Sequence, residues 1–163
     1  MYNIVTFDLN CIIISTPTGI HFEHLQLLKE YSGYILLEKP AVNTTEQINS
    51  LLSFPTDLKK RIKVNFNFQF HDLGVQLNEL INSGKLGKVF AFDVHSSHGA
   101  AFRDEWKESW RVKGGTGLGP IETTGIHYIQ FSSRLFGNFK SSHVITKCLS
   151  GNASVIDTGI INI

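Results

Sequence analysis

Glu38, Lys39 and Pro40 are the residues of this 163-residue chain whose types and spacing best fit a catalytic role. They directly follow the apolar run 34–37, which has the length and composition of a buried strand. Ligands in open α/β sheets bind beyond the carboxyl ends of the strands, where a partly desolvated lysine amine can act as general acid or base. Pro40 is expected to hold a cis peptide bond that aims Lys39 inward. The alternative is a surface lysine beside a turn proline.

A second strand end precedes this one in the chain. The run 11–15 is short, apolar and β-branched, and Thr16, Pro17 and Thr18 follow it. A helical pattern over 20–31 separates the two apolar runs, so they predict a strand–helix–strand unit with both carboxyl ends at one crevice. Because their hydrophobicity is continuous and does not alternate, both strands are expected to be buried on both faces.

His127 is a weaker candidate, because it lies among apolar neighbours in a predicted helix over 121–136. A lone histidine in such a place is more often a core residue than a catalyst. Thr123, four positions earlier, is expected to share its helix face. The glycine-rich stretch 114–117 before this helix has the composition of a phosphate-binding loop, but it lacks the lysine of a P-loop.

Other polar and aromatic pairs carry less chemical information. His95 and His98 are three residues apart, and no third ligand is evident, so no metal site is expected. Trp106 and Trp110 fit either stacking on a sugar or packing in a lid.

The elements after Pro40 have a different character from those before it. Thr44 and Gln47 fit a capping box at the start of a helix. Further helices are predicted over 73–81 and 121–136, and strands over 62–70, 89–94, 144–149 and 154–163. The strand over 62–70 alternates, as a half-buried strand does. The pattern therefore predicts an α/β segment followed by an α+β segment.

Composition excludes several classes of function. Basic residues number 15 and acidic residues 14, which gives a net charge of +1 and argues against a nucleic-acid groove or a polybasic membrane anchor. Cys11 and Cys148 are too far apart for a CxxC metal site. No apolar run approaches the roughly 20 residues that cross a bilayer. The chain is expected to be a soluble, cytoplasmic globular protein with no nucleic-acid or membrane partner.

Taken in order, these segments resemble the Gfo/Idh/MocA oxidoreductases, named for glucose–fructose oxidoreductase and inositol dehydrogenase. The residues that carry the resemblance are 8–18 with His21, 33–40, 64–70, 86–89, 110–111, the glycine cluster through His127, and 135–137. The family joins a Rossmann domain that binds NAD or NADP to a substrate domain with an open sheet. It oxidises or reduces sugars, inositols and related compounds.

The resemblance implies a fold and a domain organisation. Residues 1–41 would be the end of a Rossmann-type parallel sheet, and 42–163 part of an α+β substrate domain with a largely antiparallel open sheet. No Gly-x-Gly-x-x-Gly motif occurs in this sequence, so the dinucleotide pyrophosphate grip is missing from it. The chain is therefore expected to be an internal piece of a family member.

The resemblance also implies roles for individual residues. Lys39 and His127 would be catalytic. Cofactor-binding residues would be Ser15, Thr16, Pro17, Thr18, His21, Glu38, Lys39 and Pro40. Substrate-binding residues would be Lys39, Asn67, Trp110, Arg111, Thr123 and His127. Two positions depart from the family pattern, since Thr123 stands where an aspartate is common and Gln69 where an arginine is common.

The expected function is hydride transfer between NAD or NADP and a sugar, a cyclitol or a related hydroxyl compound. No metal is expected, and a homo-oligomer would form through the open sheet. The alternative is a non-enzymatic remnant, at most a sugar-binding or self-associating module. Exposed sheet edges favour pairing with another copy in that case.

Overall fold

A computed structural model of the chain describes residues 9–97, 99–108, 119, 121–151 and 156–163. The chain forms two compact units, Met1–Asn65 and Phe66–Ile163. The domain boundary at residue 41 stays a prediction, whereas the compact units divide after Asn65 because three further elements pack with the first sheet. No helix among the described residues has the length and apolarity to cross a membrane.

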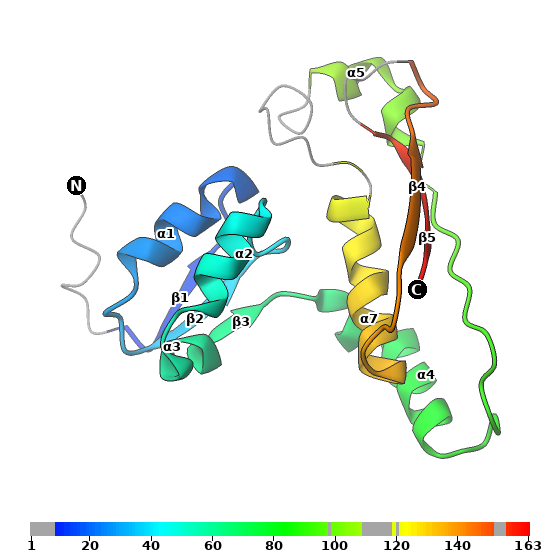
Figure 1. Ribbon diagram of the computed structural model, residues 1–163, viewed down its shortest axis with the longest axis horizontal. Helices are drawn as coiled ribbons and strands as arrows, with labels where there is room; N and C mark the ends of the chain where they lie inside the picture. Colours follow the sequence, from blue (N-terminus) through cyan, green and yellow to red (C-terminus); the bar gives the residue numbers. More distant parts are fainter. Residues whose placement is uncertain (1–8, 98, 109–118, 120, 152–155) are drawn as a thin grey trace. The chain divides into compact units, whose positions relative to one another are not determined.

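The first unit is built on a three-stranded parallel sheet (Figure 1). Its strands are β1 (Cys11–Ile14), β2 (Tyr34–Leu37) and β3 (Ile62–Val64), in the order β1-β2-β3. The 3-10 turn η2 (Thr18–Ile20) and helix α1 (His21–Leu27) connect β1 to β2, and helices α2 (Thr45–Leu52) and α3 (Thr56–Arg61) connect β2 to β3. Both connections join neighbouring parallel strands, as the predicted strand–helix–strand unit requires.

Apolar side chains from the helices cover one face of this sheet. The buried core consists of Ile14, Leu25, Leu28, Tyr31, Ile35, Leu37, Val42, Phe54 and Leu58. On the opposite face Ile13 is 66% exposed and Tyr34 is 58% exposed. The prediction that these strands are buried on both faces is therefore wrong for the described residues, because α1, α2 and α3 supply apolar contacts to one face only.

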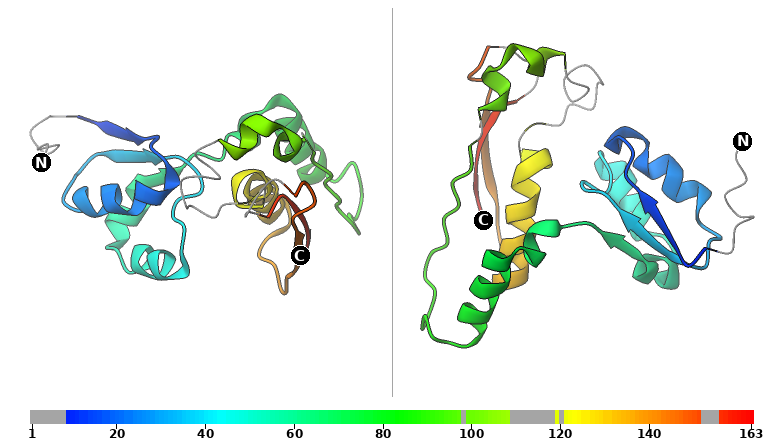
Figure 2. Two further views of the ribbon diagram at one scale, coloured as in Figure 1. Left: turned by 90° about the horizontal axis from the view of Figure 1, so that it is seen from above. Right: turned by 180° about the vertical axis from the view of Figure 1, so that it is seen from behind.

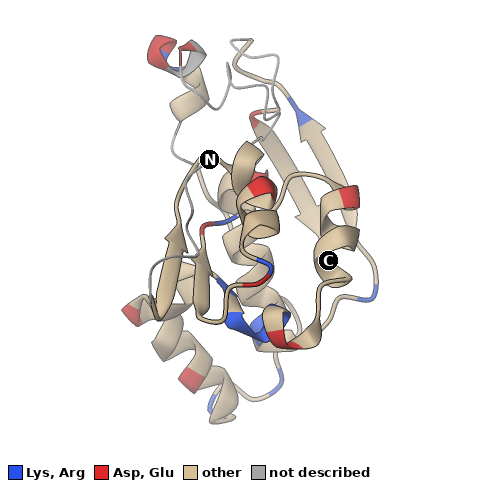
Figure 3. Ribbon diagram, turned by 90° about the vertical axis from the view of Figure 1, so that its left-hand side faces the viewer, with Lys and Arg blue, Asp and Glu red and all other residues tan. Residues whose placement is uncertain are grey.

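Side-chain hydrogen bonds fix the start of helix α2. The Thr44 hydroxyl accepts a hydrogen bond from the N–H of Gln47, and the Gln47 side chain accepts one from the N–H of Asn43. The Thr44 bond confirms the predicted helix start, whereas the Gln47 side chain reaches Asn43, one residue before the N-cap, and not the N–H of Thr44 as in a standard capping box. Figure 3 shows acidic and basic segments interspersed along the ribbon, with one basic group where Lys59, Lys60 and Arg61 end α3.

The second unit combines helices with a β-hairpin. It contains the 3-10 turn η3 (Asn67–Phe70), α4 (Asp72–Asn82), the 3-10 turn η4 (Ala100–Phe102), α5 (Asp104–Lys107), the π-helical turn η5 (Ile121–Gly125), α7 (Ile126–Phe136), β4 (His143–Lys147) and β5 (Thr158–Asn162). Strands β4 and β5 pair antiparallel, and α7 lies beside them in the views of Figure 2. The predicted helices over 73–81 and 121–136 and the predicted final strands are confirmed, with shifts at their ends.

Two predicted strands differ from the structure. The strand over 62–70 ends at Val64, because Asn65 leaves the sheet and the chain turns into η3. Phe66 and Phe68, two of the alternating aromatic residues, pack against His127 of α7 and form no strand face. Residues 89–94 have no strand assignment, so the antiparallel sheet of the described residues has two strands, β4 and β5.

Candidate active site

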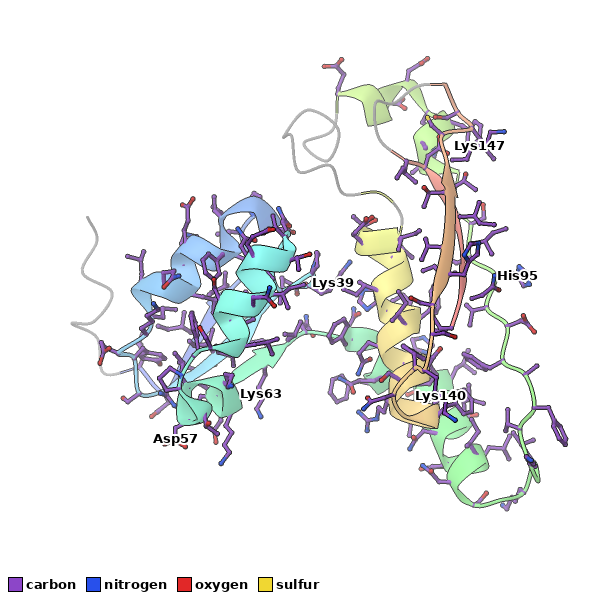
Figure 4. All side chains as sticks on the ribbon, viewed as in Figure 1. Lys39, Asp57, Lys63, His95, Lys140 and Lys147 are labelled. Atoms are coloured by element: carbon purple, nitrogen blue, oxygen red, sulfur yellow. The ribbon has the colours of Figure 1, made fainter. Side chains whose placement is uncertain are left out.

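The turn that carries Lys39 begins at the end of β2. The N–H of Glu38 donates to the carbonyl of Ile14 at 2.9 Å, which continues the pairing of β1 and β2 by one residue. The peptide bond between Lys39 and Pro40 is cis, as predicted. Lys39 is half-buried, and Figure 4 shows it on the turn beyond β2. Its position at the carboxyl edge of a parallel sheet is the one expected for a ligand-facing residue.

Asn65 anchors the first residue of this turn. Its backbone N–H donates to the carbonyl of Leu37 at 2.8 Å, and its side-chain amide donates to Oε1 of Glu38 at 2.6 Å. Oε2 of Glu38 accepts a hydrogen bond of 3.3 Å from the N–H of Lys39. Asn65 is absent from the sequence-based site, because the strand prediction ran on to residue 70. Its position directly after a third parallel strand is the signal that would have identified it.

His21 anchors the last residue of the same turn. Its Nδ1 lies 3.0 Å from the carbonyl oxygen of Pro40, and its Nε2 lies 2.8 Å from the carbonyl oxygen of Thr16. The side chain is 0% exposed. Both sequence neighbours of Lys39 are thus held by a side chain from another part of the unit. Asn65 bonds the Glu38 side chain, and His21 bonds the Pro40 carbonyl.

The segment after β1 contributes hydroxyl groups to this edge. The Thr16 Oγ1 lies 3.2 Å from Nδ1 of His24 on α1. Thr18 is buried, whereas Ser15 and Pro17 are exposed. The predicted cofactor-binding residues of the first unit therefore lie on two adjacent segments that His21 connects.

His127 lies in the second unit, near the start of α7, and is 5% exposed. Its ring stacks on Phe68, with centroids 4.1 Å apart and planes 9° apart, and Phe66 approaches with its ring plane at 87°. These aromatic contacts come from the segment around η3 and hold the imidazole in one orientation.

The remaining predicted substrate-binding residues have different environments. The hydroxyl of Thr123 donates to the carbonyl of Gly119 at 2.9 Å. Asn67 is exposed at the start of η3. Trp110 and Arg111 lie outside the described residues, as do His98 and the side chain of Trp106. No group of three His, Cys, Asp or Glu residues among the described ones could hold a metal ion.

A cavity of about 410 Å³ also occurs within the second unit. Thr123, Tyr128 and Ser132 line it from η5 and α7, and Gly159 and Ile161 line it from β5. Its lining does not include His127. Most of the lining is apolar, as expected for the space between a helix and a sheet.

Asp157, before β5, is the one strongly perturbed carboxylate among the described residues. Burial alone would raise the pKa of Asp157, but hydrogen bonds from Leu149, Ser150 and Thr158 outweigh it and hold the pKa well below its usual range. The backbone N–H groups of Leu149 and Ser150 both donate at 2.8 Å. The carboxylate therefore holds Leu149 and Ser150, which follow β4, beside the start of β5, which is a structural role.

The chain is similar in sequence and in fold to known dehydrogenases. It is 26% identical over 146 residues to scyllo-inositol 2-dehydrogenase (NADP(+)) IolW of Bacillus subtilis, which covers 90% of this chain and 40% of that protein. Levoglucosan dehydrogenase in complex with NADH and levoglucosan superposes with a TM-score of 0.77 at 22% identity, covering 94% of this chain and 44% of that one.

An inositol dehydrogenase homologue from Azotobacter vinelandii, complexed with NADH and myo-inositol, gives a TM-score of 0.76 at 21% identity over 94% of this chain and 40% of that one. At these identities the structural likeness shows the fold alone. The chain spans about 40% of the length of IolW, the B. subtilis relative. Residues 75–163 match the family model of the GFO/IDH/MocA C-terminal domain. The chain therefore belongs to the Gfo/Idh/MocA family.

Proposed function

We propose that this chain is part of an oxidoreductase that transfers hydride between NAD or NADP and a hydroxyl-bearing carbon of a sugar or cyclitol. The observation that carries the proposal is the turn Glu38–Pro40. It places a half-buried lysine at the carboxyl edge of a parallel sheet, between two residues that Asn65 and His21 hold. Membership of a family of oxidoreductases supports it.

Lys39 is proposed as the acid–base residue. Oxidation of an alcohol removes a hydroxyl proton as hydride leaves the same carbon, and a positioned amine can accept that proton. In the reverse direction the ammonium group returns the proton to the carbonyl oxygen. A fixed backbone on both sides of Lys39 limits where its amine can reach, which favours proton transfer in one geometry.

The described residues fit one end of a dinucleotide. The Thr16 hydroxyl and the turn Glu38–Pro40 offer polar groups at the edge where ligands of parallel sheets bind. We propose that they lie along the nicotinamide side. A bound nicotinamide would supply hydride acceptance and donation. The sequence contains no Gly-x-Gly-x-x-Gly turn for the pyrophosphate, so we expect the 163-residue chain by itself to bind NADH or NADPH weakly.

His127 is proposed as a second group that hydrogen-bonds the reacting hydroxyl. Its stacking on Phe68 supports a fixed imidazole direction, which hydrogen bonding to a substrate would require. Thr123 and Asn67 remain proposed substrate contacts of the second unit, as do Trp110 and Arg111.

A sugar or cyclitol is the proposed substrate class, because two of the matching relatives are named for inositols. Inositol 2-dehydrogenase of Rhizobium meliloti is 23% identical over 164 residues, and scyllo-inositol is in the name of the B. subtilis relative. NADPH- and NADH-linked absorbance assays of the complete protein against a panel of inositols and aldoses test the proposal. Turnover of at least one such compound is expected, whereas turnover only of compounds without a ring hydroxyl would contradict it.

Association of copies through the β4–β5 sheet is proposed as well. All five residues of β4 are exposed, and the paired Ile145 and Ile160 give one face of the hairpin an apolar surface. Apolar surface of this kind is typical of an interface between proteins. Light scattering of the complete protein should show a dimer or larger species, and Ile145→Lys should lower the mass. An unchanged mass would remove β4 from the interface.

A further inference from the structure

The imidazole of His21 connects two segments at the carboxyl edge of the first sheet. Its Nε2 lies 2.8 Å from the Thr16 carbonyl oxygen, and its Nδ1 lies 3.0 Å from the Pro40 carbonyl oxygen. The side chain is fully buried, so water does not compete for either nitrogen. The ring thereby joins the segment after β1 to the turn that carries Lys39.

Both oxygens are acceptors, so each hydrogen bond requires a proton on the nitrogen that faces it. A neutral imidazole carries one N–H, and a proton on Nδ1 supplies the bond to the Pro40 carbonyl.

Other ionisable side chains lie on the segments that contact this ring. His24 on α1 has its Nδ1 against the Thr16 hydroxyl. On the turn, Oε1 of Glu38 accepts from Asn65 and Oε2 accepts from the N–H of Lys39. The Lys39 side chain is on the same turn.

We propose that His21 is a positioning residue for Lys39, with an Nδ1–H that donates to the carbonyl of Pro40 while Nε2 lies against the segment after β1. This role rests on the proposed function, because it takes Lys39 as the acid–base residue. Pro40 directly follows Lys39, so the bond from Nδ1 fixes the backbone on one side of the lysine. The bond between Glu38 and Asn65 fixes it on the other side. His21 acts through that backbone in this proposal, in place of the cofactor contact that the family resemblance implies for it.

The protonation state is open to direct measurement. Two-bond ¹H–¹⁵N spectra of the complete ¹⁵N-labelled protein, with the His21 peaks assigned by their loss in His21→Asn, report each ring nitrogen separately. We expect Nδ1 to carry a proton. An unprotonated Nδ1 would overturn the proposal. This readout does not depend on activity, so its failure is distinguishable from failure of the proposed function. Absence of dehydrogenase turnover in the unaltered protein would contradict the proposed function.

Two amide substitutions separate the two bonds. The amide of asparagine reaches the place of Nδ1, and that of glutamine reaches the place of Nε2. His21→Asn therefore keeps a donor toward Pro40, and His21→Gln keeps a donor toward Thr16. We expect kcat to fall roughly tenfold to a hundredfold in His21→Gln and much less in His21→Asn, with the KM for cofactor unchanged in both.

Glu23→Gln, an exposed change on the same helix, is the matched control and should leave kcat unchanged. Equal losses of kcat in the two His21 variants would show that the link to Pro40 does not position Lys39. A raised cofactor KM with unchanged kcat would instead place His21 in contact with the cofactor, and would also overturn the proposal. If neither variant folds, the ring peaks of His21 are assigned by through-bond correlation to its own backbone, and the spectra of the unaltered protein decide.

Discussion

The side-chain amide of Asn65 donates a 2.6 Å hydrogen bond to Oε1 of Glu38, and this bond joins the segments that follow β3 and β2. The second carboxylate oxygen accepts from the N–H of Lys39. One carboxylate thus ties the proposed acid–base residue to the neighbouring strand. The arrangement depends on the parallel register, in which Leu37 lies opposite Val64.

Asn65→Asp should weaken this edge, because it replaces the amide donor by a second carboxylate facing Glu38. We expect the free energy of unfolding to fall by about 1–3 kcal/mol at neutral pH, as when a buried hydrogen bond is lost. The loss should shrink at acid pH, where protonation of one carboxylate relieves the repulsion. Urea unfolding at both pH values measures it, with the exposed Asn67→Asp as control. Equal destabilisation by the two variants would contradict the role of Asn65.

His127→Phe separates catalysis from packing. Phenylalanine can keep the ring stack with Phe68, so we expect the free energy of unfolding to change by less than about 1 kcal/mol. The variant has no hydrogen-bonding nitrogen, and kcat should fall by roughly a hundredfold or more if the imidazole serves the reacting hydroxyl. Steady-state kinetics of the complete protein provide the measurement. Unchanged kcat would leave His127 as a core residue.

Because only one face of the sheet is buried, truncating side chains on its two faces should lower the free energy of unfolding by different amounts. Leu37 is 0% exposed, whereas Ile13 is 66% exposed on the opposite face. Leu37→Ala should lower the free energy of unfolding by about 2–5 kcal/mol, because it leaves a cavity among packed side chains. Ile13→Ala should cost less than about 1 kcal/mol in the same urea experiment. Comparable losses would show that the face carrying Ile13 is also covered.

Asp157 should make stability depend on acid pH. Since folding lowers the pKa of Asp157, the stabilisation by its carboxylate is fully present above the unfolded pKa of about 3.9 and is lost as the pH falls toward the folded value. Asp157→Asn should therefore lower stability at neutral pH and flatten its decline below about pH 5. Thermal unfolding across this range measures both effects, with exposed Asp93→Asn as control. A decline as steep as that of the unaltered chain would exclude Asp157 as its source.

Local patterns predicted much of the first unit. Four apolar residues in each of β1 and β2 identify the strands, and the hydroxyl of Thr44 and the amide of Gln47 identify the start of α2. The cis bond at Lys39 was also predicted from local sequence. These features depend on residues close together in the chain, where spacing is informative.

Other features depend on contacts between distant residues. The alternation of Phe66, Phe68 and Phe70 reads as a strand, but the first two pack on His127 of α7. Nδ1 of His21 contacts the carbonyl of Pro40, 19 residues away in the chain. The pairing of β1 with β2 brings these two residues together. Asn65 gains its role only because three strands end at one edge.

The most direct test of the proposed function is the effect of Lys39→Met and Lys39→Arg on kcat and on NADH and NADPH binding in the complete protein. Arginine keeps the positive charge but does not release its proton, so it separates acid–base action from charge alone. We expect kcat to fall by roughly a hundredfold to ten-thousandfold in both variants, with cofactor dissociation constants within about twofold. Lys63→Met, an exposed change on β3, should leave both quantities unchanged. Retention of kcat in Lys39→Met would contradict the assignment of Lys39 as the acid–base residue.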